Sequence, residues 1–209
     1  MRKEIGSAIY LAGLCLFLFL PIWLPKNWVL VLFSFSITLF AALLEYRKKQ
    51  ILYLESLFLV FLLAISYFKS RHESLCLNHS LYLVFFVISG LNLFLLIQRI
   101  FKASSAGMDF IISGLNGYLL TGFIFSVLCS YAEFVRPGSF LGQSAFDFRD
   151  LHQFVYFSFV TFLTLGYGDI LPVSGLAKSL SVFIGLFGTF YLTLVLGLVL
   201  GKYFKTQRH

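Results

Sequence analysis

Long apolar runs without a charged side chain dominate this sequence and restrict what it can fold into. A helix needs roughly 20 mostly apolar residues to cross the hydrocarbon core of a bilayer. Charge-free runs of about this length occur at residues 5–25, 27–44, 74–98, 110–132 and 179–201. A further run, at residues 51–68, contains Glu55 near its start. A water-soluble core could not bury this much apolar surface, so the runs predict six transmembrane helices.

The charged residues indicate how these helices are oriented. Only 12% of the 209 residues are charged, whereas about a quarter are charged in a soluble domain. Of the 16 Lys and Arg residues, ten fall in the loops that six spans would place inside and six in the outer loops. This bias predicts that both termini are cytoplasmic, in a plasma membrane or a bacterial inner membrane. The net charge of +7 therefore indicates topology, and no nucleic-acid partner is expected.

The first run follows Arg2 and Lys3, as the apolar core of a secretory signal peptide would. It is longer than a signal core and no A-x-A-like cleavage site follows, so we expect an uncleaved first helix. Pro and Trp residues at its end predict an interfacial turn, because Trp anchors at the headgroup level; they are Pro21, Trp23, Pro25 and Trp28.

A short polar stretch at residues 101–109 divides the chain into two domains, 1–109 and 110–209. The first domain contains four predicted helices. The second has a different layout: a helix, a long loop, a short apolar hairpin and a last helix. The hairpin begins with residues 151–163, which are too few to cross the bilayer at about 1.5 Å per residue. They predict a half-length helix that enters the membrane and returns.

The half-length helix leads into Thr164-Leu165-Gly166-Tyr167-Gly168-Asp169. With this motif the sequence resembles the tetrameric potassium-channel family, in which such a segment is the selectivity filter. A dehydrated cation needs replacement oxygens, and backbone carbonyls supply them without net charge. Gly166 and Gly168 lack a Cβ, which permits the alternating conformations that turn successive carbonyls toward one axis. Thr164 adds a hydroxyl oxygen, and Tyr167 is expected to brace the strand against surrounding aromatic rings.

The resemblance implies an all-α membrane protein with six transmembrane helices, a re-entrant pore helix and a filter. The filter residues Thr164, Leu165, Gly166, Tyr167 and Gly168 would bind K+ as the permeant ion, and no cofactor is expected. One filter segment supplies a quarter of the carbonyl cage, so the expected functional unit is a homotetramer in contact with membrane lipids. The negative C-terminal dipole of the pore helix would favour a cation at the pore centre.

Three residues beside the filter are expected to support it: Asp169, Tyr156 and Phe157. Tyr156 and Phe157 occupy the places of an aromatic pair that is often Trp-Trp in the family. Val160 stands where some bacterial members have Glu, so Asp169 is expected to bond the Tyr156 hydroxyl but no buried acid. The family usually has Val at position 165, but Leu165 leaves the backbone carbonyl unchanged.

In the last helix, Gly188 falls at the position of the family's gating hinge, and Gly185 is a near neighbour in register. Close helix packing is the alternative role of both glycines, since small residues are favoured at membrane helix interfaces. Four residues share one helical face that is expected either to line the pore cavity or to pack against the pore helix; they are Thr189, Thr193, Leu196 and Leu200.

The fourth span, residues 81–100, carries only Arg99, whereas voltage-gated relatives have a basic residue at every third position. Each charge that crosses the field contributes about 2.3 kcal/mol per 100 mV, so steep voltage gating is not expected. Residues 1–109 therefore resemble a voltage-sensor domain without gating charges. We expect gating to come from the filter, the inner helices, lipid or a separate regulatory subunit.

Other functions explain less of the sequence. The main alternative is a non-conducting accessory subunit of a potassium-channel assembly. An enzyme is not expected, because no nucleophile–base spacing, metal-ligand pair or phosphate loop is present. His152 would either sense external pH or start the pore helix. Three cysteines are too few for a disulfide framework or a zinc site, and pairing of Cys76 with Cys129 is an alternative to a lipid-buried Cys129.

Overall fold

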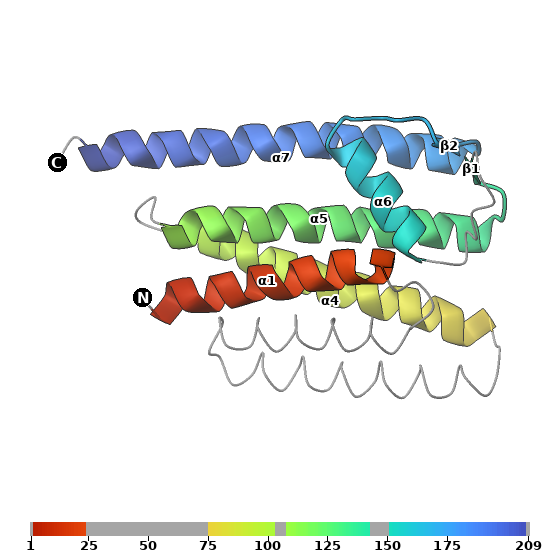
Figure 1. Ribbon diagram of the computed structural model, residues 1–209, viewed down its shortest axis with the longest axis horizontal. Helices are drawn as coiled ribbons and strands as arrows, with labels where there is room; N and C mark the ends of the chain where they lie inside the picture. Colours follow the sequence, from red (N-terminus) through yellow and green to blue (C-terminus); the bar gives the residue numbers. More distant parts are fainter. Residues whose placement is uncertain (1, 24–74, 103–107, 143–150, 208–209) are drawn as a thin grey trace.

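The computed structural model describes residues 2–23, 75–102, 108–142 and 151–207 (Figure 1). The predicted spans at 27–44 and 51–68 lie outside these residues. The described part is mostly helical, and its elements in chain order are α1 (Arg2–Trp23), α4 (Leu75–Lys102), α5 (Met108–Val135), β1 (Phe140–Gly142), α6 (Leu151–Phe162), β2 (Ile170–Pro172) and α7 (Gly175–Gln207).

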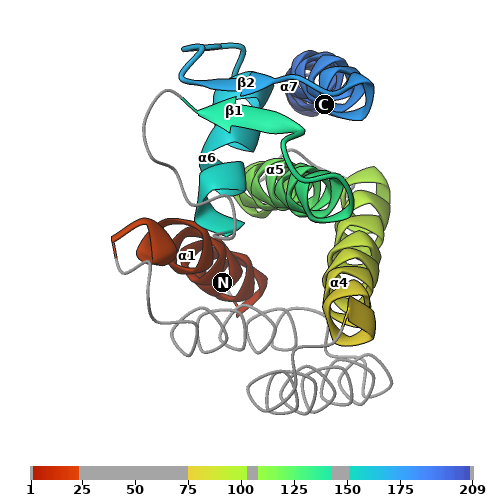
Figure 2. The ribbon, with the colours of Figure 1, turned by 90° about the vertical axis from the view of Figure 1, so that its right-hand side faces the viewer.

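Helix α5 is the centre of the described structure. It packs against α1, α4, α6 and α7, and the end view in Figure 2 shows these helices around it. Most of its apolar side chains are buried against these neighbours, although the helix is hydrophobic all round. Helix α1 begins and α7 ends at the same end of the molecule (Figure 1).

Two stretches of the described helices are long and apolar enough to cross a membrane, Phe110–Val135 in α5 and Gly175–Val195 in α7. They confirm the helices predicted at 110–132 and 179–201, although α7 starts four residues earlier than predicted. It starts at Gly175 because Ser174 caps it: the Ser174 hydroxyl accepts a hydrogen bond from the Ala177 N–H at 3.1 Å. Shorter apolar stretches occur at Ser7–Leu16 and Tyr82–Gln98.

The end of α1 differs from the prediction. The helix continues through Pro21 and ends at Trp23, so Pro21 belongs to the last turn of the helix and not to an interfacial turn. A proline removes only its own N–H and disturbs the turn before it. Its effect here is therefore confined to the end of the helix.

Polar contacts fasten the N-terminal helices to α5. The Asn116 side-chain amide of α5 donates to the Ser7 carbonyl of α1 at 3.2 Å. On the other side, the Tyr82 and Ser130 hydroxyls lie 3.0 Å apart between α4 and α5. Cys129 of α5 is a buried free cysteine, so the alternative in which it pairs with Cys76 is wrong.

Two short strands, which the sequence did not predict, lie between the end of α5 and the start of α7. Strand β1 pairs antiparallel with β2, with Leu141 opposite Leu171. The Val173 N–H extends the ribbon by donating to the Ser139 carbonyl at 2.8 Å. The described part is mostly helical, as predicted, and adds a two-stranded ribbon in which β1 precedes α6 and β2 leads toward α7 (Figure 2).

Candidate functional site

The half-length helix α6 ends in a Schellman motif at Thr164. The Thr164 N–H donates to the Thr161 carbonyl at 3.0 Å, and the Leu165 N–H donates to the Val160 carbonyl at 2.9 Å. This pair of bonds, with Thr164 in the left-handed region at φ 60°, defines the motif. The Gly166 N–H also donates to Val160, at 3.3 Å. The first amides after the helix are therefore satisfied by the helix itself.

From this point the backbone alternates. Thr164, Gly166 and Gly168 have φ values of 60°, 57° and 75°, and the intervening Leu165 and Tyr167 have negative φ. In an ordinary strand successive carbonyls point to opposite sides; a change of sign at every second residue turns them toward the same side. No described residue donates a hydrogen bond to the carbonyl oxygens of residues 164–167. The segment thus presents a row of unpartnered oxygens.

The alternation was predicted for the two glycines but not for Thr164. A non-glycine residue at positive φ is uncommon, and nothing in its side chain signals it. The conformation follows from the helix end, since the C′ position of a Schellman motif requires it.

The outer end of the segment is tied to α6. The Tyr156 hydroxyl donates to Asp169 Oδ2 at 2.6 Å, as the sequence predicted, and Asp169 Oδ1 accepts from the Ile170 N–H at 3.1 Å. The bond to Asp169 raises the pKa of Tyr156 to about 12, so the hydroxyl remains protonated and able to donate. Phe157 is buried against Phe140 of β1, with ring centroids 5.1 Å apart. It therefore packs against the ribbon.

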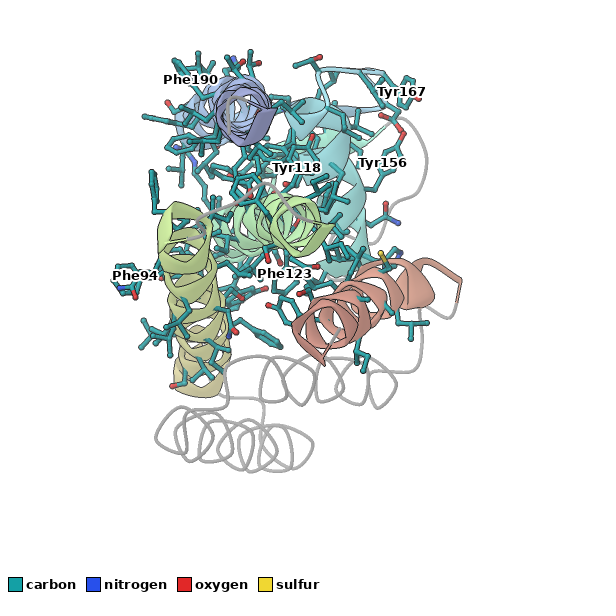
Figure 3. All side chains as sticks on the ribbon, turned by 90° about the vertical axis from the view of Figure 1, so that its left-hand side faces the viewer. Phe94, Tyr118, Phe123, Tyr156, Tyr167 and Phe190 are labelled. Carbon is teal, nitrogen blue, oxygen red and sulfur yellow. The ribbon has the colours of Figure 1, made fainter. Side chains whose placement is uncertain are left out.

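Tyr167 lies at the edge of the molecule near Tyr156 (Figure 3). It is 66% exposed and makes no ring contact with a described aromatic residue. The aromatic bracing expected for Tyr167 is therefore absent within the described part of its own chain. Leu165 is 53% exposed as well, which leaves the whole segment on the surface of the single chain.

A buried acid that the sequence analysis missed organises the loop before β1. Glu133, at the end of α5, accepts hydrogen bonds from the Gly138 N–H at 2.7 Å and from the Phe140 N–H at 3.0 Å. Only 9% of Glu133 is exposed. Because Phe140 packs on Phe154 and Phe157 of α6, Glu133 fixes the ribbon against α6. The sequence feature that could have indicated this role is the position of Glu133, a single acid between the apolar run 110–132 and the Pro137-Gly138 turn.

Gly188 lies against the end of α6. A Cβ at this position would collide with the Phe162 carbonyl oxygen and would lie 3.0 Å from the Phe162 carbonyl carbon. The packing alternative is thus realised at Gly188, and α7 is helical through this point. A Cβ at Gly185 would meet nothing within 4 Å. A hinge at Gly188 stays a prediction.

The rotation of α7 follows from the same contacts. Gly188, Tyr191 and Val195 face α5 and α6. Thr189 and Thr193 are exposed, and their hydroxyls donate to carbonyls of the preceding turn at 3.0 and 2.9 Å. The two threonines therefore do not pack against α6, which excludes the packing alternative for them. Of the predicted cavity residues, the side chains of Leu196 and Leu200 lie outside the description.

Other candidate residues contribute less. His152 starts α6 half-buried, with Nε2 3.2 Å from Gln153 Nε2. The Arg99 side chain and the acidic residues at 147 and 150 lie outside the described part. Within the described residues, no three His, Cys, Asp or Glu side chains form a group that could hold a metal ion.

Comparison with known proteins agrees with this geometry. Residues 113–205 match a protein family described as ion channel. The match runs from α5 through α6 and the Thr164–Asp169 segment into α7. Searches of curated proteins and of solved structures gave no match. Over these residues the chain is similar to ion channels, and the two apolar helices are consistent with a membrane protein.

Proposed function

We propose that the chain is one subunit of a homotetrameric, potassium-selective channel that passes K+ passively through a central pore. The observation that carries the proposal is the alternation of φ from Thr164 to Gly168, where no described residue donates a hydrogen bond to the carbonyls of residues 164–167. Four such rows around one axis would replace the hydration shell of a dehydrated cation with carbonyl oxygens. The ion is cargo, and these residues hold it through the backbone.

Exposure of the filter segment supports the tetramer. An extended backbone is not tolerated against lipid, because its polar groups have no partners there. Yet Leu165 and Tyr167 are more than half exposed in the single chain. Other copies of the chain would cover them, and an aromatic residue of a neighbouring subunit would brace Tyr167. The exposed face of α7, with Phe190 pointing away from α5 (Figure 3), is available for lipid and for the same contacts.

Orientation and gating follow the sequence argument. The common end of α1 and α7 (Figure 1) supports placing both termini on one side, which the Lys and Arg bias assigns to the cytoplasm of a plasma or bacterial inner membrane. Helix α4 contains only Arg99 and Lys102 as basic residues, both at its inner end. Because so few charges can move through the membrane field, the membrane potential contributes little free energy to opening. Opening is therefore not steeply voltage-dependent.

The test is flux from the purified full-length protein in liposomes. Wild type should conduct K+ well above Na+. Gly166→Ala puts a side chain at φ 57°, strains the filter and should abolish selective flux. Gly185→Ala is the matched control, because its Cβ meets nothing within 4 Å, and it should conduct as wild type. A well-ordered tetramer that conducts under no condition would favour the accessory-subunit alternative.

A further inference from the structure

A tyrosine of the inner helix is seated in a notch on the outer helix. The Tyr191 hydroxyl of α7 donates to the Gly114 carbonyl of α5 at 2.8 Å. The notch exists because Gly117 has no side chain: a Cβ there would overlap the Tyr191 hydroxyl. A methyl group on Gly117 and the tyrosine hydroxyl therefore cannot occupy this place together.

The notch adjoins the end of the pore helix. Tyr191 contacts the ring of Tyr118 with centroids 5.6 Å apart, and Tyr118 stacks on Phe162 at 4.6 Å. Phe162 is the last residue of α6, and its carbonyl lies against Gly188, one turn before Tyr191 on α7. Tyr118 lies between α5 and α7 in Figure 3. Tyr191 is thus part of the contact that holds the pore helix, outer helix and inner helix together.

The two neighbouring tyrosines differ in one respect. The Tyr191 hydroxyl is bonded, whereas the Tyr118 hydroxyl is buried with no hydrogen-bond partner among the described residues. Both rings have the same chemistry and touch each other. They form an internal control for the effect of the hydrogen bond alone.

We propose that Tyr191 is a positioning residue: its bond to Gly114 holds the inner half of α7 against α5, and its release lets this half of α7 move outward and conduct. The proposal rests on the proposed channel function. In lipid no hydrophobic force drives helices together, so packing and interhelical hydrogen bonds decide their association. The Gly114 carbonyl also accepts the ordinary helical bond of α5. Removing the tyrosine hydroxyl therefore leaves no unsatisfied backbone group, so the variant measures only the contribution of the hydrogen bond between the two helices.

The experiment compares Tyr191→Phe with Tyr118→Phe in the full-length tetramer in liposomes. Hydrogen exchange of the α7 amides after residue 191 reports the position of the helix without requiring conduction, and K+ flux reports the pore. Tyr191→Phe should raise both by about threefold to tenfold, the range expected for one interhelical hydrogen bond. Tyr118→Phe should leave both at the wild-type value.

Gly117→Ala is a second route to the same state, because the added methyl displaces the hydroxyl from the notch; it should reproduce the Tyr191→Phe result. Unchanged exchange in Tyr191→Phe, reduced flux, or an equal rise in Tyr118→Phe would each overturn the proposal. If neither wild type nor Tyr191→Phe conducts, but hydrogen exchange in Tyr191→Phe is faster than in wild type, the positioning role is supported and the channel function is contradicted.

Discussion

The contact between Gly188 and the end of α6 can be tested with one methyl group. In Gly188→Ala the new Cβ would collide with the Phe162 carbonyl oxygen and lie 3.0 Å from Phe162 Cδ2. The carbonyl cannot rotate away, because it belongs to the last turn of α6, where the Schellman motif fixes the backbone. The two helices must therefore separate. Overpacking of this kind costs about 1–3 kcal/mol per site.

Gly185→Ala is the matched control for this substitution. Its Cβ meets nothing within 4 Å, so only the helix-propensity gain of about 0.5–1 kcal/mol is expected. The same gain applies at Gly188, which leaves Gly188→Ala destabilised by up to about 2.5 kcal/mol per subunit and about 1–3 kcal/mol less stable than Gly185→Ala. The proposed tetramer would contain the substitution four times, which amplifies the difference.

The assay is thermal unfolding of the purified protein in detergent by circular dichroism, together with K+ flux in liposomes. Gly188→Ala should unfold at a lower temperature than wild type, and Gly185→Ala at an equal or higher one. A hinge without tight packing predicts another pattern: Gly188→Ala would keep wild-type stability and lose flux only. Equal unfolding temperatures for the two alanine variants would refute the packing argument.

Three further predictions follow from the site. Tyr156→Phe removes the hydrogen bond to the Asp169 carboxylate, a bond that contributes about 1.5–3 kcal/mol. K+ flux should then decay faster while the K+/Na+ ratio is unchanged, and a wild-type time course would contradict this prediction. Glu133→Gln replaces one carboxylate oxygen with a donor, so either the exposed Gly138 N–H or the buried Phe140 N–H loses its acceptor. This should lower the unfolding temperature by the equivalent of about 1–3 kcal/mol, and an unchanged temperature would contradict it. Thr193→Cys in a cysteine-free background should react with a water-soluble thiol reagent and block flux, whereas Tyr191→Cys should be protected; the reverse order would place the wrong face toward the pore.

The sequence predicted those parts of the site that depend on residue type. The spacing of Gly166 and Gly168 predicted the alternating backbone, because only glycine adopts positive φ without a steric penalty. The charge-free run at residues 151–163, which is too short to span the bilayer, predicted α6. Tyr156 and Asp169 could be paired by counting along the motif, and their hydroxyl–carboxylate bond is present.

The missed features depend on tertiary context. The strands of the ribbon have three residues each, too few for an alternating pattern to appear. The sequence gives no sign of the role of Glu133, because its carboxylate accepts from backbone N–H groups that only the folded turn brings near it. Positive φ at Thr164 arises from the way α6 ends and not from the threonine itself.

The rotation of α7 was the hardest property to predict, and the reason is physical. A membrane helix is apolar on nearly every side, so the contrast between polar and apolar faces that orients a soluble helix is weak. The rotation of α7 is set instead by glycines, whose missing side chains let another helix approach closely. Gly188 admits the Phe162 carbonyl, and Gly117 on α5 admits Tyr191. These two absent side chains, on different helices, turn Thr193 toward the proposed pore, although neither glycine has a hydrophobic or polar signature of its own.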